Sequence, residues 1–171
     1  MGGLTIIEDT RNKPGKHEAK HDGWAAAGVA VIRSKLAHGD YALPPVVSVD
    51  TKQDIYELAL DIDKEHERFR AEMIGAREAG TQLVVLVENA DGVETLDDLR
   101  AWRESAKHFD MRKRKSGNFK ARRIDGARLA RACSTMERKY GVRFEFCRPS
   151  EAAARVVRIL TEGGGRGADD A

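Results

Sequence analysis

Apolar residues along the chain follow two patterns, short runs of the kind found in strands and a helical spacing of the kind found in amphipathic helices. The run 83–87 is continuous and predicts a strand covered on both faces, whereas 142–147 alternates apolar and charged residues as a half-exposed strand does. Within 54–79 apolar residues recur at helical spacing, which predicts one long helix with a buried face.

The other apolar segments complete a chain in which strands and helices alternate. Further strands are predicted over 5–8, 29–33, 39–43 and 46–52, and further helices over 16–27, 96–104, 125–140 and 151–160. This order predicts an α/β fold with a central mixed β-sheet flanked by helices. A length of 171 residues suits one domain, which we place at 1–162, and the glycine-rich, acidic stretch 163–171 is expected to be a disordered tail.

Charged residues gather on one face of the predicted strand 46–52. Side chains alternate along a strand, so Asp50 and Lys52 share a face. The proline pair at 44–45 interrupts the chain before this strand and favours a hairpin, which would bring Asp40 back toward Asp50. Mg²⁺ prefers carboxylate ligands, and a lysine beside them supplies positive charge for a phosphate. The arrangement is typical of metal-assisted phosphodiester hydrolysis.

A third carboxylate, Asp9, follows the apolar run 4–7 at the end of the first predicted strand. It would join Asp40 and Asp50 if the ends of these strands meet. The same spacing also suits a surface ion pair between Asp50 and Lys52, which would stabilise the fold by less than about 1 kcal/mol. Residue spacing alone leaves both interpretations open.

Four segments occur in a characteristic order, namely Asp9-Thr10-Arg11, Gly39-Asp40-Tyr41, Val49-Asp50-Thr51-Lys52 and His66-Glu67-Arg68-Phe69, followed by an apolar strand that ends at Glu88. This order resembles the nuclease domain of the XPF family of structure-specific endonucleases, within the PD-(D/E)xK superfamily. The similarity is strongest to compact phage and bacterial members without a helix-hairpin-helix domain.

The resemblance implies a restriction-endonuclease-like nuclease core and a metal-dependent DNA endonuclease. Its catalytic residues would be Asp9, Asp40, Asp50 and Lys52, with the three acids as ligands of Mg²⁺ or Mn²⁺ and with Arg11 and Arg68 beside the DNA phosphates. The resemblance further implies branched or duplex DNA as the substrate and a role in replication, recombination or repair. It also implies pairing into a homodimer, in the cytoplasm of a bacterium or of a phage-infected host.

The sequence departs from the family pattern at four positions. Asn12 stands where the family has Glu, Asp50 is the shorter acid at a Glu position, Thr51 replaces Arg, and Tyr56 replaces the Asp that follows this triplet. The shorter acid withdraws a carboxylate by one methylene, and the lost Arg removes a charge that would stabilise the transition state. A catalytically inactive DNA-binding module on the same fold is therefore an alternative. The three acids and Lys52 remain, so we expect an active enzyme.

A basic segment, 112–123, contains seven Lys or Arg among its twelve residues, although the net charge of the whole chain is only +2. We interpret it as a flexible arm that follows a DNA backbone, with Phe119 able to stack on a base. A solvated loop is the alternative. The DNA-binding candidates in this segment are Arg112, Lys113, Arg114, Lys115, Lys120, Arg122 and Arg123.

A rival motif is His17-Glu18-Ala19-Lys20-His21, a literal His-Glu-x-x-His of the kind found in zinc peptidases. Such a helix needs an apolar side, yet the flanking residues are polar and Gly23 follows closely. We therefore expect a solvent-exposed first helical turn near the DNA and keep zinc peptidase activity as a remote alternative.

The composition bears on the cellular compartment. Cys133 and Cys147 are too few and too far apart for a zinc or redox motif, which suits a reducing cytoplasm. No apolar stretch approaches the roughly 20 residues of a membrane-spanning helix, and the N-terminus lacks the pattern of an export signal. We expect no membrane partner.

Overall fold

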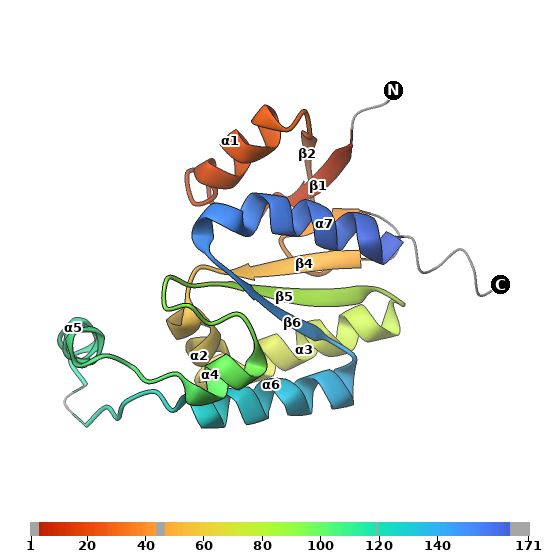
Figure 1. Cartoon of the computed structure of the whole chain (residues 1–171). Coiled ribbons are helices and arrows are strands. Elements are labelled where there is room, and N and C mark those ends of the chain that lie inside the picture. Colours follow the sequence, from red (N-terminus) through yellow and green to blue (C-terminus); the bar gives the residue numbers. More distant parts are fainter. Residues whose placement is uncertain (1–3, 44–46, 119, 165–171) are drawn as a thin grey trace.

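A mixed β-sheet forms the centre of the fold (Figure 1). The computed structural model describes residues 4–43, 47–118 and 120–164. The strands in these residues are β1 (Thr5–Asp9), β2 (Ala30–Ser34), β3 (Tyr41–Leu43), β4 (Val47–Lys52), β5 (Gln82–Glu88) and β6 (Arg143–Cys147). Their order in the sheet is β2-β1-β3-β4-β5-β6, with antiparallel pairing on both sides of β3 and parallel pairing elsewhere.

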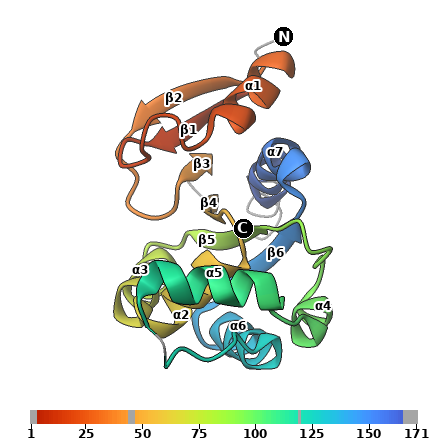
Figure 2. The ribbon, with the colours of Figure 1, turned by 90° about the vertical axis from the view of Figure 1, so that its left-hand side faces the viewer.

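Helices cover both faces of this sheet (Figures 1 and 2). The helices α1 (Glu18–Ala26) and α7 (Ala152–Gly164), the latter preceded by the short η1 (Pro149–Glu151), lie on one face. The other face carries α2 (Ile55–Asp63), α3 (His66–Glu78), α4 (Leu96–Ala101) and α6 (Gly126–Tyr140). The predicted α/β architecture, a central mixed sheet flanked by helices, is confirmed.

Each face of the sheet has its own apolar core. The alternation of side chains along β4 directs Val49 toward α7, and it directs Lys52 toward α2 and α3. Trp24 and Trp102 are both buried, one in each of these cores. The charged face of β4 therefore lies under α2 and α3 rather than in solvent.

The prediction of one long helix over 54–79 is wrong, because the chain turns between α2 and α3. The carbonyl of Leu60 accepts hydrogen bonds from the amides of both Lys64 and Glu65, which ends α2. Residues 63–65 are all charged, so no apolar contact holds the chain in helical register at this point. The apolar stripe continues on both sides of the turn, which is why the periodicity does not reveal it.

The prediction of a flexible basic arm is corrected as well. Residues Ala106–Ser116 form a helix, α5, that stands apart from the two layers (Figure 1). Ser105 caps its start by accepting a hydrogen bond from the amide of His108, and Gly117 ends it in the left-handed conformation at φ 63°. Arg112, Lys113, Arg114 and Lys115 are thus helical, whereas Phe119 lies outside the described residues.

The other boundaries differ in smaller ways. The helix predicted over 96–104 ends at Ala101, because Trp102 turns extended and its indole donates to Asp91 at 2.9 Å. The predicted tail begins inside α7, which runs to Gly164, and Gly163 lies so close to Val47 that a Cβ would clash with it. Residues 165–171 lie outside the described residues. None of the described helices could span a membrane.

Candidate active site

The β3–β4 hairpin brings Asp40 to the end of β4, as predicted. Tyr41 pairs with Val49 across the hairpin, and the amide of Asp40 donates to the carbonyl of Val49 at 2.8 Å. The carboxylate of Asp40 accepts from the amide of Thr51 at 3.0 Å and from its hydroxyl at 2.6 Å. Thr51, which replaces an arginine of the family pattern, therefore orients the acid. The proline pair lies outside the described residues.

Gly39 is required by the backbone at this turn. Its φ of +74° is the left-handed region that side chains disfavour, and a Cβ would lie 3.0 Å from the carbonyl oxygen of Val49. The amide of Gly39 donates to Oε1 of Glu72 at 2.9 Å. The Gly-Asp pair thus fixes Asp40 to β4 and draws a carboxylate from α3 toward the same place.

Lys52 lies between two carboxylates on the covered face of β4. Its ammonium is 2.7 Å from Oδ2 of Asp50 and forms a second ion pair with Asp61 of α2. All three residues are buried, with exposures of 6% for Asp50, 4% for Lys52 and 3% for Asp61. The ammonium also lies 5.0 Å from the centre of the Phe69 ring. The alternative of a surface ion pair between Asp50 and Lys52 is therefore wrong.

Arg68 joins this cluster from α3. One of its guanidinium nitrogens is 2.9 Å from Asp61, and the side chain also pairs with Glu65 at 2.7 Å. Glu72 approaches it at 4.0 Å. Arg68 is more than half exposed, so its guanidinium places a positive charge at the surface next to the buried pair, where a phosphate could reach it.

Asp9 lies close to this cluster through its backbone, while its carboxylate is bound by Arg11. The amide of Asp9 donates to the carbonyl of Asp40 at 2.8 Å. The carboxylate accepts from the amide and the Nε of Arg11, each at 2.8 Å. Burial alone would raise the pKa of Asp9, but the hydrogen bonds from Arg11 outweigh it and lower the pKa. Asp9 is thus a charged carboxylate that already has a partner.

Asn12, which stands at a Glu position of the family pattern, holds the same strand ends together. Its amide donates to Glu8 at 3.4 Å and to the carbonyl of Asp40 at 3.5 Å. Asn12 therefore has a structural contact to Asp40 but brings no charge.

Asp50 has the most perturbed acidity in the cluster. Burial raises its pKa, Lys52 lowers it, and the negative charges of Asp40 and Glu72 raise it further, to about 7. Lys52 cannot neutralise Asp50 fully, because the same ammonium also serves Asp61. The acids of this site therefore repel one another near neutral pH, which favours the binding of a cation.

This acidity predicts a pH-dependent stability in the absence of metal. A carboxyl whose pKa is higher in the folded than in the unfolded state stabilises the fold while it is protonated. The contribution of Asp50 should therefore be lost as the pH rises from about 4 through about 7. Urea unfolding at several pH values would measure it. Asp50→Asn should flatten this part of the profile, whereas the exposed Asp97→Asn should not.

Comparisons with known proteins were made for the sequence and for the fold. No protein-family model matches the sequence. No curated protein matches it either. The solved structures that match the fold include XPF from Aeropyrum pernix, with a TM-score of 0.61 and 17% identity over 94% of this chain, and XPF from Aeropyrum pernix in complex with DNA, with a TM-score of 0.62 and 16% identity over 95%. The chain has the fold of XPF.

The match confirms the resemblance at the level of the fold, including the restriction-endonuclease-like core. The chain spans 63% and 66% of the length of those two XPF chains. In this XPF-like fold the structure brings Asp40, Asp50 and Lys52 together at the end of β4. It binds Asp9 to Arg11 and places Arg68 at the rim.

Sequence reasoning missed two carboxylates of the cluster, Asp61 and Glu72. Both lie outside the apolar stripe of the predicted long helix. Asp61 is buried where it pairs with Lys52 of β4, and Glu72 accepts a hydrogen bond from the amide of Gly39. The only available signal was their spacing with Arg68, which sets acid and arginine on one side of a helix.

The two histidines of the His-Glu-x-x-His motif do not point toward a common site. His17 lies just before α1, beside the Tyr41 ring, whereas His21 pairs with Glu8 at 3.1 Å. The predicted solvent-exposed context is wrong, since His17 is buried and Lys20 forms a buried ion pair with Glu88 at the end of β5. Among the described residues no three His, Cys, Asp or Glu side chains are grouped to hold a metal ion.

The basic residues predicted to bind DNA divide into two groups. Arg112 is held by Glu104, with two hydrogen bonds at 2.9 and 2.8 Å, and is only partly exposed. The others lie on the surface of α5 or on the segment that returns from it. They are Lys113, Arg114, Lys115, Lys120, Arg122 and Arg123.

Proposed function

We propose that this protein is a divalent-metal-dependent DNA endonuclease that hydrolyses phosphodiester bonds. The observation that supports it most is the buried row Asp50, Lys52 and Asp61, joined by Asp40, at the end of β4 in an XPF-like fold. A buried charge cluster of this kind destabilises a fold more often than it stabilises it, so its presence argues for a function.

The charges of the site fit a divalent cation. The cluster contains more carboxylates than cations, so a phosphodiester would be repelled from it without a further positive charge. The carboxylates are Asp9, Asp40, Asp50, Asp61 and Glu72, and the cations are Arg11, Lys52 and Arg68.

The described residues form no ready cage of three ligands, which suits an ion that keeps several waters and shares oxygens with its substrate. Mg²⁺ or Mn²⁺ would be held by Asp40 and Asp50, with Asp9 joining only on release from Arg11. The bound ion would supply a water of lowered pKa and would stabilise negative charge on the phosphate.

The side chains around this position have separate roles in the proposal. Lys52 is kept protonated by its two acidic partners, which raise its pKa against the effect of burial, and it holds a fixed positive charge beside the scissile phosphate. Arg68 binds the neighbouring phosphate from the rim. Thr51 holds the carboxylate of Asp40 in place.

The substrate and the setting are also part of this proposal. One of the matching structures is XPF in complex with DNA, which supports DNA as the partner of this chain. We propose branched DNA as the preferred form, with a role in replication, recombination or repair in the cytoplasm of a bacterium or phage-infected host. A homodimer through the nuclease domain is part of this proposal.

A catalytically inactive DNA-binding module is the second candidate. It is favoured by the engagement of Asp9 with Arg11, which leaves one predicted metal ligand occupied by the chain itself. Under this alternative the fold and the basic surface remain, and DNA is bound but not cut.

Cleavage assays distinguish the two. Labelled flap, fork, four-way-junction and linear duplex DNA would be incubated with the protein in Mg²⁺, Mn²⁺ or chelator. We expect cutting only with metal, and faster cutting of branched than of linear substrates. Binding without cutting in every metal would establish the inactive module instead.

The surface of α5 should contribute to DNA affinity through phosphate contacts. Changing Lys113, Arg114 and Lys115 together to Gln should weaken binding and reduce the slope of log Kd against log salt by about 0.9 for each lost contact. Fluorescence anisotropy at several salt concentrations measures it. The triple change Arg138, Lys139 and Arg143 to Gln, on another surface, is the control, and an unaltered slope for the α5 variant would exclude this contact.

A further inference from the structure

The helix α5 is held in place by polar contacts rather than by an apolar core. None of its residues is buried, and its Met111 is 57% exposed. The hydrophobic effect therefore contributes little to its position. In Figure 1 α5 lies beyond the edge of the layered body, on the side toward which β4 ends, and Figure 2, viewed from that side, shows it in front of the body.

Glu104 clamps the base of this helix. We call residues 103–125 the arm, because Arg103 and Asp125 pair as an isolated antiparallel bridge where the segment leaves and rejoins the body. The carboxylate of Glu104 has no exposed surface and accepts from Arg112 at 2.9 and 2.8 Å and from the amide of Ile124 at 2.8 Å. A single carboxylate thus joins α5 to the returning chain.

The guanidinium of Arg112 extends the same connection. It also donates to the carbonyl of Arg122 at 2.8 Å. Burial would raise the pKa of Glu104, but the hydrogen bonds from Arg112 and Ile124 lower it, so the clamp stays charged at neutral pH. Arg112 is committed to this clamp and is not available to a phosphate without breaking it.

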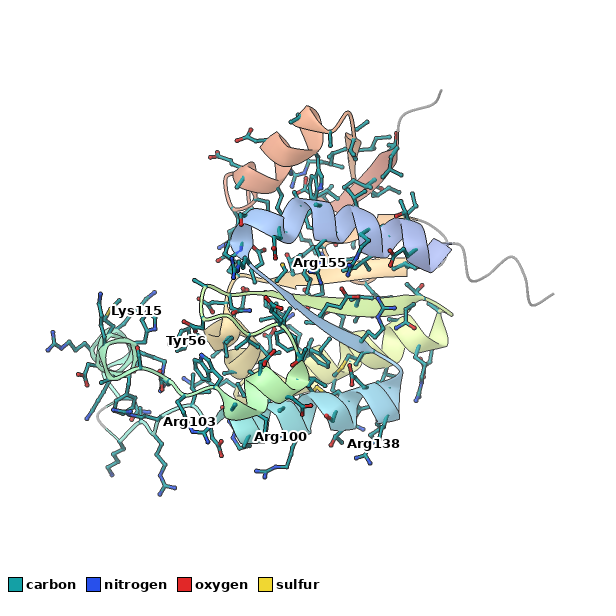
Figure 3. All side chains as sticks on the ribbon, viewed as in Figure 1. Tyr56, Arg100, Arg103, Lys115, Arg138 and Arg155 are labelled. Atoms are coloured by element: carbon teal, nitrogen blue, oxygen red, sulfur yellow. The ribbon has the colours of Figure 1, made fainter. Side chains whose placement is uncertain are left out.

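Tyr56 provides the second attachment. It lies in the first turn of α2, four residues after Lys52. The centre of its ring is 5.4 Å from the ring centre of His108 of α5 and 5.9 Å from that of Trp102, both edge to face. Figure 3 shows Tyr56 on the side of the body that faces α5, with Lys115 at the top of that helix. The residue that replaces an acid of the family pattern therefore connects the arm to the element that follows the candidate catalytic strand.

The arm carries charge for a polyanion. Outside the clamp its cations on α5 and on the returning chain are Lys107, Lys113, Arg114, Lys115, Lys120, Arg122 and Arg123, against two acids, Asp110 and Asp125. Phe109 packs between α5 and the returning chain and joins them. The centre of its ring is 5.5 Å from the guanidinium carbon of Arg112 and 5.6 Å from that of Arg123.

We propose that Glu104 is a positioning residue that holds α5 in one orientation beside the end of β4, so that the cations of the arm bind the phosphate backbone of the duplex being cut. The proposal rests on the proposed function and adds that the arm is preset rather than ordered by DNA. A preset surface binds more tightly because it loses less conformational freedom on binding.

The orientation of α5 can be measured without DNA. Spin labels at Lys115→Cys and Arg138→Cys report the distance between α5 and α6, and both native cysteines are buried. We expect one narrow distance distribution in the otherwise unchanged protein and a broad one with Glu104→Gln. The exposed His108→Ala, which removes only the ring contact with Tyr56, should broaden it less. Equal widths in all three proteins would overturn the proposal.

Measuring the DNA affinity of Glu104→Gln then distinguishes the effect of the orientation of α5 from the effect of the charge of the arm. Glu104→Gln removes a negative charge from a basic arm, so electrostatics alone predicts equal or tighter binding. Our proposal predicts binding weakened about tenfold in chelator and cut sites spread over several phosphates in Mg²⁺. Glu94→Gln, an exposed change of the same charge, is the control.

The outcomes bear on the two proposals separately. If the unchanged protein binds and cuts DNA while Glu104→Gln behaves identically, the preset arm is wrong and the nuclease assignment stands. If the unchanged protein binds no DNA, the proposed function fails, and the role of the arm in DNA binding fails with it.

Discussion

Replacing Asp50 by asparagine should abolish metal-dependent DNA cleavage, by about 10³-fold or more, and leave DNA binding within about twofold of the original. Asn keeps the size of the side chain but removes the negative charge that would hold a cation beside Lys52. The proposed DNA-binding surface on α5 is not affected by this change. Single-turnover cleavage of a labelled flap substrate, with binding measured in chelator, tests both parts.

The stability of the Asp50→Asn variant shows whether a loss of cleavage is caused by misfolding. The charged form of Asp50 is disfavoured in the folded protein, as its raised pKa of about 7 records, so the neutral Asn should not lower stability near neutral pH. A loss of cleavage with an unchanged or higher unfolding midpoint therefore assigns Asp50 to the chemistry. Asp97→Asn on the surface is the control, and full cleavage by Asp50→Asn would remove Asp50 from the site.

The sequence predicted the hairpin and its charges because strand geometry is local. Alternation along β4 is sufficient to put Asp50 and Lys52 on one face, and the proline pair in the sequence is sufficient to predict a hairpin that brings Asp40 toward Asp50. What alternation cannot tell is which face is covered. A buried Asp50–Lys52 pair and an exposed one have the same spacing, and only the packing of α2 and α3 decides between them.

The errors in the fold have related physical causes. The turn between α2 and α3 breaks no apolar periodicity, so its existence depends on the hydrogen bonds of Leu60 and on charged residues that tolerate solvent. The helix α5 was missed although Ser105 and Gly117 are typical cap residues, because a helix without an apolar face has no periodicity to detect. Charge density was taken for flexibility, whereas the buried Glu104 organises the segment.

Removing the charge of Lys52 should destabilise the protein severely. Lys52→Met would leave Asp50 and Asp61, both almost fully buried, without their shared counterion, and breaking a buried ion pair costs on the order of 3–5 kcal/mol. That is a large part of the stability of a single domain. Urea unfolding of Lys52→Met against the original protein measures the loss.

A second substitution shows that stranded charge causes the loss. The double variant with Lys52→Met and Asp50→Asn has one uncompensated acid instead of two. The remaining acid, Asp61, keeps its ion pair with Arg68 at 2.9 Å, so about half of the lost stability should return. Lys52→Arg keeps the charge and should retain more stability than Lys52→Met. It should still cut poorly, because the planar guanidinium cannot place its charge where the ammonium lies between two carboxylates. A loss below about 1 kcal/mol in Lys52→Met would mean that water, not Lys52, compensates these acids.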